Sequence, residues 1–200
     1  YAHELGYVIK LLAIAKLNGD KVEVRVHPTM LPARSLLANV GGAFNAVCVI
    51  GDAVGPTLFY GQGAGEMPTA SAVVADIIDA AKSILGRGQS HVPRAWLPES
   101  QAALSLCPMD DIETRYYVRL VVMDEPGVLA QISSILGKYR ISIASVIQKE
   151  RHDADDTASI VMVTHHAIEK DMQKAMQEID ALDAVKCASR LIRIEEAVAF

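Results

Sequence analysis

The chain has 200 residues, 51% of them hydrophobic and 22% charged, a composition typical of globular proteins that bury one core or two small ones. The formal net charge of -5 at pH 7 argues against nucleic acid and membrane surfaces as partners, because neither attracts an acidic protein. The three cysteines, Cys48, Cys107 and Cys187, lack the spacing of a disulfide framework or a zinc site, so we expect a reducing, cytoplasmic setting. No apolar run reaches the ~20 residues of a membrane helix.

The first segment begins without a methionine and has apolar residues at helical spacing. Leu5, Val8 and Leu12 recur every three or four residues, and Asn18 with Gly19 supplies a stop. The pattern predicts an amphipathic helix over residues 2–18. A start inside such an element suggests part of a larger protein.

The next segments indicate extended structure. "KVEVRVHPTML" alternates Val22, Val24 and Val26 with Glu23, Arg25 and His27, the period of a half-buried strand, and Pro28 is expected to end it. Residues 32–40 suit a short helix. "AFNAVCVIGDAVGPTLFYG" predicts two strands joined by the turn-rich residues 51–56, which is an antiparallel hairpin.

Three glycines at Gly61, Gly63 and Gly65 then precede a second amphipathic helix, whose apolar stripe runs from Val73 to Leu85. The glycines have the outline of a phosphate loop. They fail the dinucleotide fingerprint, because Glu66-Met67-Pro68 stands where a third glycine belongs. On spacing alone a strand-to-helix turn is favoured over a phosphate contact.

Residues 87–113 break the periodicity. Pro93, Pro98 and Pro108 interrupt this polar, turn-rich stretch. It predicts a linker between two units, in contact with a surface through Trp96.

Residues 114–200 predict the order strand, helix, strand, strand, helix, strand. In ~85 residues this order is the ferredoxin-like split arrangement, an antiparallel sheet with both helices on one face. The whole chain is therefore expected to be α+β: an antiparallel-sheet segment with helices over residues 1–86, the linker, and a βαββαβ unit over residues 114–200.

The turn after the first strand of that unit reads Asp124-Glu125-Pro126-Gly127. Glycine lets a ligand approach the backbone, amides at a helix start bind a carboxylate, and Asp124 suits an amino group. The turn therefore suits a free amino acid. On physics alone the favoured alternative is that Asp124 caps the helix and Gly127 is a turn residue.

The stretch "VRLVVMDEPGVLAQISSILGKYRISIASVIQK" resembles the ACT domain, a regulatory module of amino-acid metabolism that pairs with its own copies. The resemblance covers residues 116–194. It implies an amino-acid site formed by these residues: Asp124, Gly127, Val128 and Leu129, with Ser145 and Ile147 of the next strand nearby.

The first half of the chain resembles bacterial homoserine dehydrogenase. "AHELGYVIKLLAIAK", "VEVRVHPTMLP" and "FNAVCVIGDAVGPTLFYGQGAGEMPTASAVVADI" together resemble the later part of that enzyme's catalytic region, which an ACT domain follows in the longer bacterial form. The resemblance implies an oxidoreductase that interconverts L-aspartate 4-semialdehyde and L-homoserine with NAD(P)H, on the route to threonine and methionine. It places Gly63, Ala64, Gly65 and Glu66 beside cofactor and substrate, with Thr69 in a lesser role.

The nucleotide domain and the catalytic lysine of that family precede the matched region. Lys10 and Lys16 are expected on a solvated face and are not substitutes for that lysine. We therefore expect no catalytic residue in this chain, which alone should be inactive. The segment that would distinguish NAD from NADP also lies outside it.

No metal site is expected. His165 and His166 are adjacent on a predicted strand, so their side chains point to opposite faces. The stretch 153–156, "DADD", lacks the ligand spacing of a calcium loop and is interpreted as a solvated turn.

The expected partners are an amino-acid effector, with threonine implied by the resemblance, and further copies of the chain in a homodimer or homotetramer. The main alternative is a non-catalytic amino-acid-binding or dimerisation module. A weaker one is another ACT-tailed enzyme such as aspartate kinase.

Overall fold

The computed structural model describes residues 1–86, 104–148 and 156–196. The chain folds as two units, one formed by residues 1–38 with 104–197 and the other by residues 39–103 with 198–200. Each unit combines strands and helices, as the α+β prediction requires. The predicted surface contact of Trp96 and most of the "DADD" turn lie outside the described residues.

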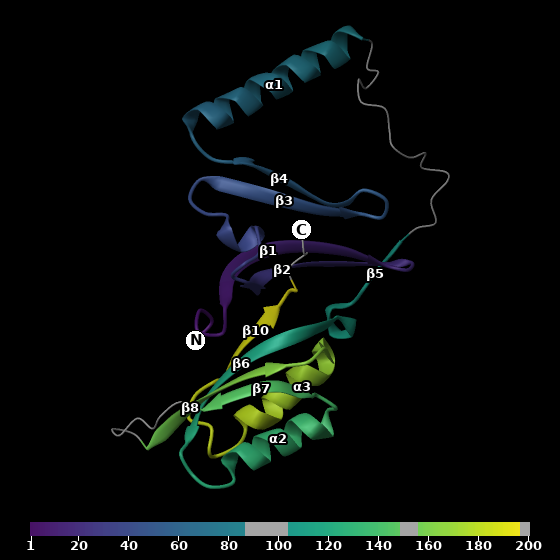
Figure 1. Cartoon of the computed structure of the whole chain (residues 1–200). Helices are drawn as coiled ribbons and strands as arrows, with labels where there is room; N and C mark the ends of the chain where they lie inside the picture. Colours follow the sequence, from purple (N-terminus) through teal and green to yellow (C-terminus); the bar gives the residue numbers. More distant parts are fainter. Residues whose placement is uncertain (87–103, 149–155, 197–200) are drawn as a thin grey trace. The chain divides into compact units, whose positions relative to one another are not determined.

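The first unit is built on a mixed sheet whose main path is β1-β2-β10-β6-β8-β7 (Figure 1). Two further short strands attach to it, β5 beside β2 and β9 beside β6. The strands are β1 Tyr7–Asn18, β2 Lys21–Pro32, β5 Ser105–Leu106, β6 Glu113–Met123, β7 Ile143–Gln148, β8 Thr157–Thr164, β9 Ala167–Ile168 and β10 Arg190–Ile194.

The predicted βαββαβ order is confirmed in β6, α2 (Val128–Lys138), β7, β8, α3 (Glu169–Asp180) and β10. Both helices bury their apolar side chains against one face of the four antiparallel strands. The buried residues of this cluster include Leu120, Ile132, Met162 and Met172. Figure 1 shows the two helices together on that side of the sheet.

The predicted helix over residues 2–18 is wrong, because Tyr7–Asn18 forms strand β1. β1 pairs antiparallel with β2 along its whole length, from Tyr7 opposite Pro32 to Asn18 opposite Lys21. Asn18 and Gly19 begin a tight hairpin turn instead of ending a helix, and Gly19 has a φ of 63°. Continuous pairing with a neighbouring strand outweighed the local helical spacing.

Strand β2 is half-buried, but the buried side is the polar one. Arg25 is 5% exposed, whereas Val24 and Val26 are 56% and 66% exposed. Pro28 does not end the strand, which continues to Pro32. The parallel pairing with β10 involves only Thr29 and Met30 of β2. Pro28 lies outside this short ladder, so the absence of its N–H removes no hydrogen bond between β2 and β10.

Residues 104–113, part of the predicted linker, belong to the sheet unit. Ser105 and Leu106 pair with β2, and Ile112 is 1% exposed. Residues 1–38 likewise belong with the βαββαβ unit instead of with residues 39–86.

The second unit contains the predicted hairpin, formed by β3 (Phe44–Gly51) and β4 (Gly55–Gln62), and helix α1 (Glu66–Leu85). A 3-10 turn, η1 (Leu37–Asn39), stands where a short helix was expected. None of the residues of α1 is buried, and its apolar stripe is exposed. Among the described residues, no helix is long and apolar enough to cross a membrane.

Candidate functional site

The loop between β4 and α1 contains the residues expected to contact the cofactor. Gly65 is the N-cap of α1 with a φ of 132°, a conformation that residues with a Cβ rarely adopt. A Cβ on Gly63 would lie 1.8 Å from Asn45 Nδ2 on β3. The Thr69 amide donates to the Gly65 carbonyl at 3.1 Å, which closes the first turn of the helix. The backbone conformation therefore favours glycine at Gly65, whereas a side chain at Gly63 would have to displace the exposed Asn45 side chain.

This loop fits a contributory contact to an anionic cofactor. No side chain of the described residues caps the start of α1, a helix of 20 residues, so its first amides remain available to a phosphate. Glu66 in the first turn adds a negative charge at the same place, which limits how closely a phosphate can bind. The loop supplies backbone donors at the start of the helix.

The turn after β6 contains the first residues of the expected amino-acid site. Gly127, with a φ of 95°, is the N-cap of α2, so Asp124 does not cap the helix as the alternative interpretation held. Asp124 instead accepts a hydrogen bond from Gln148 Nε2 at 3.3 Å, and its amide donates to the Asp156 carbonyl at 3.0 Å. These contacts hold the turn beside the end of β7.

The other predicted site residues lie on different faces of the sheet. Val128 is 5% exposed within the helix-side core, while the neighbouring Leu129 is 36% exposed. Ser145 and Ile147 lie opposite Val163 and Val161 of β8. Those two valines belong to the apolar cluster on the face away from the helices. The structure thus brings together Asp124, Gly127 and Leu129, and places Ser145 and Ile147 on the other side of the sheet.

A depression of about 460 Å³ lies beside the same turn, between the start of α2 and the segment that follows α3. Its lining includes Glu125, Gln131, Asp183 and Lys186, as well as Val128. The ammonium of Lys186 donates to the Asp183 carbonyl at 3.1 Å. The sequence did not single out the segment after α3, because its residues form no motif.

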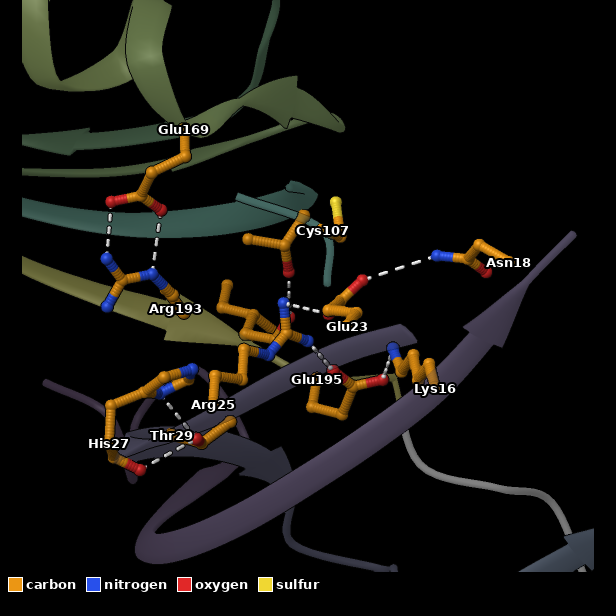
Figure 2. Close-up of polar contacts among 12 residues, drawn as sticks. Lys16, Asn18, Glu23, Arg25, His27, Thr29, Cys107, Glu169, Arg193 and Glu195 are labelled. Atoms are coloured by element: carbon orange, nitrogen blue, oxygen red, sulfur yellow. Dashed lines mark hydrogen bonds and ion pairs between the residues drawn. The ribbon is translucent and has the colours of Figure 1, made fainter. Parts of the chain in front are cut away.

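A buried group of charged residues, here called the polar seam, joins β2 to the βαββαβ unit (Figure 2). Sequence reasoning missed it, apart from noting the polar side of β2. Its members are Glu23, Arg25, His27 and Thr29 of β2, Tyr116 of β6, Glu169 of α3, Arg193 of β10, and Glu195 just after β10.

Glu169 organises one half of the polar seam. Arg193 binds both of its carboxylate oxygens, the Tyr116 hydroxyl donates to Oε2 at 2.8 Å, and Gln173 Nε2 donates to Oε1 at 2.7 Å. Burial alone would raise the pKa of Glu169, but the hydrogen bonds from Arg193, Gln173 and Tyr116 outweigh it and lower the pKa below 4.5. Burial and the bond to Glu169 raise the pKa of Tyr116. Glu169 is therefore a fixed carboxylate and Tyr116 a fixed donor.

Arg25 organises the other half. Its guanidinium lies 2.6 Å from Glu23 Oε1 and donates through Nη2 to Glu195 Oε2 at 2.6 Å. Lys16 of β1 pairs with the other oxygen of Glu195. Lys16 of β1 and Arg25 of β2 are thereby linked through Glu195, just after the end of β10 (Figure 2).

His27 lies between the two halves and is 9% exposed. Its Nδ1 is 3.1 Å from the Pro28 carbonyl and 3.0 Å from Thr29 Oγ1, so a proton on Nδ1 serves both contacts. Nε2 is buried and has no hydrogen-bond partner among the residues that the structure describes. Burial, opposed by the Pro28 contact and reinforced by the charges of Arg193 and Arg25, lowers the pKa of His27 below 6.5.

In the described part of the chain, no three His, Cys, Asp or Glu side chains gather as metal ligands. His165 and His166 are both exposed just beyond the end of β8. The charged groups of the polar seam are paired with one another instead.

Comparison with known proteins gives two matches, one in each of the two segments for which the sequence suggested a family. Residues 1–78 match the family "Homoserine dehydrogenase" and residues 116–184 match "ACT domain". The homoserine dehydrogenase of Neisseria gonorrhoeae is 48% identical over 196 residues, which are 98% of this chain and 45% of that protein. The chain matches the C-terminal region of homoserine dehydrogenases, ACT domain included.

Other relatives agree with this assignment. The homoserine dehydrogenase of Pseudomonas aeruginosa is 42% identical over 197 residues, with the same two coverages of 98% and 45%. The crystal structure of a homoserine dehydrogenase from Thiobacillus denitrificans superposes with a TM-score of 0.84 at 47% identity, covering 98% of this chain and 44% of that one. The chain thus spans less than half the length of the homoserine dehydrogenases that it matches.

The two candidate loops fall in different family matches. The loop of Gly63 to Glu66 lies within the homoserine dehydrogenase match, and the Asp124 to Gly127 turn lies within the ACT match. The Arg25 bond to Glu195 joins strand β2, which lies in the first match, to the end of β10, which lies just beyond the ACT match. The polar seam therefore connects the homoserine dehydrogenase match to the last strand of the βαββαβ unit.

Proposed function

We propose that the full-length protein containing this chain is an NAD(P)-dependent homoserine dehydrogenase. It would interconvert L-aspartate 4-semialdehyde and L-homoserine, in the biosynthesis of threonine and methionine. The observation that carries this proposal is the pair of family matches in the order known for the longer bacterial enzyme, with 48% identity to a homoserine dehydrogenase across 98% of the chain.

In this proposal the described residues assist the chemistry without performing it. A hydride transfer needs a nicotinamide against the carbonyl carbon and a proton donor at its oxygen. Gly63, Ala64, Gly65 and Glu66 would lie beside cofactor and substrate, with Thr69 at the helix start, and the uncapped amides of α1 support that role. The catalytic lysine and the nucleotide domain would come from the rest of the protein, so the 200-residue chain alone would be inactive.

The ACT unit would bind a free amino acid, and threonine, the product of the pathway, is the proposed effector. A carboxylate at Asp124 and an exposed turn at Gly127 suit the amino and carboxylate groups of such a ligand. The effector would act by shifting a conformational equilibrium of the enzyme. Further copies of the chain would complete a homodimer or homotetramer.

A calorimetric and thermal-shift titration of the chain tests the regulatory half of the proposal. L-threonine should raise the unfolding temperature progressively with concentration, because a ligand that binds only the folded state stabilises it by mass action. L-methionine, L-isoleucine and NADPH serve as comparisons. A chain that responds to none of the amino acids would refute the regulatory site.

The rival function is a non-catalytic regulatory or dimerisation module. A response to an amino acid without any response to NADPH would describe the isolated chain as such a module. Only the activity of the full-length protein separates the two functions completely.

A further inference from the structure

The β1–β2 hairpin is attached to the ACT sheet by a short ladder. β2 and β10 pair in parallel only at Thr29 with Arg193 and at Met30 with Ile194. One further backbone bond runs from the Glu195 amide to the Met30 carbonyl at 3.0 Å. A ladder of this length provides few backbone bonds, so side chains contribute to the attachment: the apolar cluster around Met30 and Ile194 on one hand and the polar seam on the other.

His27 lies in the middle of that attachment as a neutral, buried imidazole. The groups that face it are Arg25 on its own strand, Arg193 on β10 and Glu169 on α3, with the Tyr116 hydroxyl of β6 bonded to Glu169. β1 adds Lys10, opposite Thr29, and Lys16, opposite Glu23. The positive groups that act on His27 are thus Arg25 of β2 and Arg193 of β10.

The carboxylates of the polar seam are already engaged. Glu169 binds Arg193, Glu23 lies against Arg25, and Glu195 binds both Arg25 and Lys16. A proton on Nε2 of His27 would create a buried donor and a positive charge where Nε2 now has no partner among the described residues. The new donor would have no acceptor among the described residues, and Glu169, the carboxylate that favours a charged imidazole, is already bound by Arg193. The attached state therefore disfavours the proton.

We propose that His27 is a proton-sensitive latch, whose protonation loosens the β1–β2 hairpin from the ACT sheet. The latch connects the segment of homoserine dehydrogenase similarity to the ACT unit. A fall in pH would thereby weaken the connection through which the two segments influence one another.

The direction of the effect follows from the neutral state of the buried imidazole. His27 has a lower pKa in the attached state than its ordinary value of 6.5, so it binds a proton more readily when the hairpin is detached. The attachment is at full strength above pH 6.5 and is lost progressively as the pH falls from 6.5 toward the lower value of the attached state. Below that value the loss levels off.

Hydrogen exchange of the chain tests the latch at about pH 7.5 and about pH 5.5, which lie on either side of ordinary histidine titration. After correction for the intrinsic effect of pH on exchange, protection of the β1 and β2 amides should fall by up to about tenfold between the two pH values, since pH 5.5 lies about one unit below ordinary histidine titration. The amides of α2 should keep their protection. In His27→Asn, whose side-chain amide can donate in place of Nδ1 but does not titrate, the pH-dependent loss should disappear.

An equal pH-dependent loss in wild type and His27→Asn would overturn the proposal, and so would an equal loss in α2. The histidine signals of the wild-type chain give a second test that requires no variant. His27 should titrate with a midpoint below 6.5 in an NMR titration. A midpoint for His27 at or above 6.5 would overturn the proposal even if His27→Asn fails to fold.

Discussion

Glu169 lies 3% exposed and accepts hydrogen bonds from a tyrosine, a glutamine and an arginine on three different elements. An isolated carboxylate at such a depth would be strongly destabilising, and its partners make the arrangement tolerable. Arg193 depends on Glu169 in the same way, because the Glu169 carboxylate neutralises the charge of its partly buried guanidinium. At the scale of single residues, the connection between α3 and β10 therefore rests on this pair.

Glu169→Gln should lower the free energy of unfolding by about 2 kcal/mol, since it leaves the partly buried Arg193 without a counter-charge. Urea denaturation at neutral pH measures the change. Glu178→Gln is the matched control, because Glu178 pairs with Lys138 on the exposed surface and should unfold almost as wild type does. An equal effect of the two substitutions would contradict the structure of the polar seam.

Asp124→Asn should remove or greatly weaken the stabilisation by L-threonine, because the carboxylate is the proposed partner of the amino group of the ligand. The measurement is the thermal shift at a fixed threonine concentration. Asp110→Asn removes the same charge from an exposed position outside the Asp124 turn and should leave the response unchanged. A full response in Asp124→Asn would exclude this carboxylate from the site.

At the scale of elements, the sequence predicted the ACT unit better than the β1–β2 hairpin. Helices α2 and α3 bury most of their apolar stripes within their own domain, so local periodicity and tertiary packing agree. In β1 they disagree, because Leu5, Val8 and Leu12 also suit a helix and only pairing with β2 selects the strand. In β2 the charged side is buried because Arg25 pairs with Glu23 on the same strand and with Glu195 just after β10. Glu195 is 170 residues from Arg25, so no local pattern in the sequence indicates this partner.

The candidate site shows the same limit. The glycines of the β4–α1 loop and the Asp124 turn could be found because they form local motifs. Ser145 and Ile147 could be placed on a strand but not on a face, since the face depends on the register between β7 and β8. Nothing in the sequence revealed His27 as buried, because its neighbours in space come from β10 and α3.

Gly63→Ala should destabilise the β4–α1 loop by about 0.5 to 1 kcal/mol, because the new methyl group would overlap the exposed Asn45 side chain and force it into another rotamer. Gly61→Ala on the same strand meets no described atom within 4 Å and is the control. Thermal unfolding of the chain compares the two variants. A combined Gly63→Ala and Asn45→Ala change should restore part of the loss. Equal stability of the two single variants would show that Asn45 does not approach Gly63 in solution.

At the scale of the whole molecule, the chain exposes many large apolar side chains. Val26 of β2, Phe59 of β4 and Ile77 of α1 are each more than 60% exposed. Apolar surface on this scale is normally covered in a stable protein. Coverage by another copy accounts for part of it in the proposed oligomer.

Light scattering of the purified chain at micromolar concentration should therefore give two or four times the mass of a single chain. Association through apolar contacts should persist at high salt, because salt screens charges and does not weaken apolar burial. A monomer across the concentration range would contradict the proposed homo-oligomer.

The measurement that tests the central claim most directly is the oxidation of L-homoserine by the full-length protein, followed through reduction of NAD+ or NADP+. The proposal predicts homoserine-dependent reduction that L-threonine inhibits, and no reduction by the 200-residue chain alone. Loss of the threonine inhibition in Asp124→Asn, with the uninhibited rate unchanged, would show that threonine inhibits the enzyme through the Asp124 turn. A full-length protein that reduces neither cofactor in the presence of homoserine would contradict it.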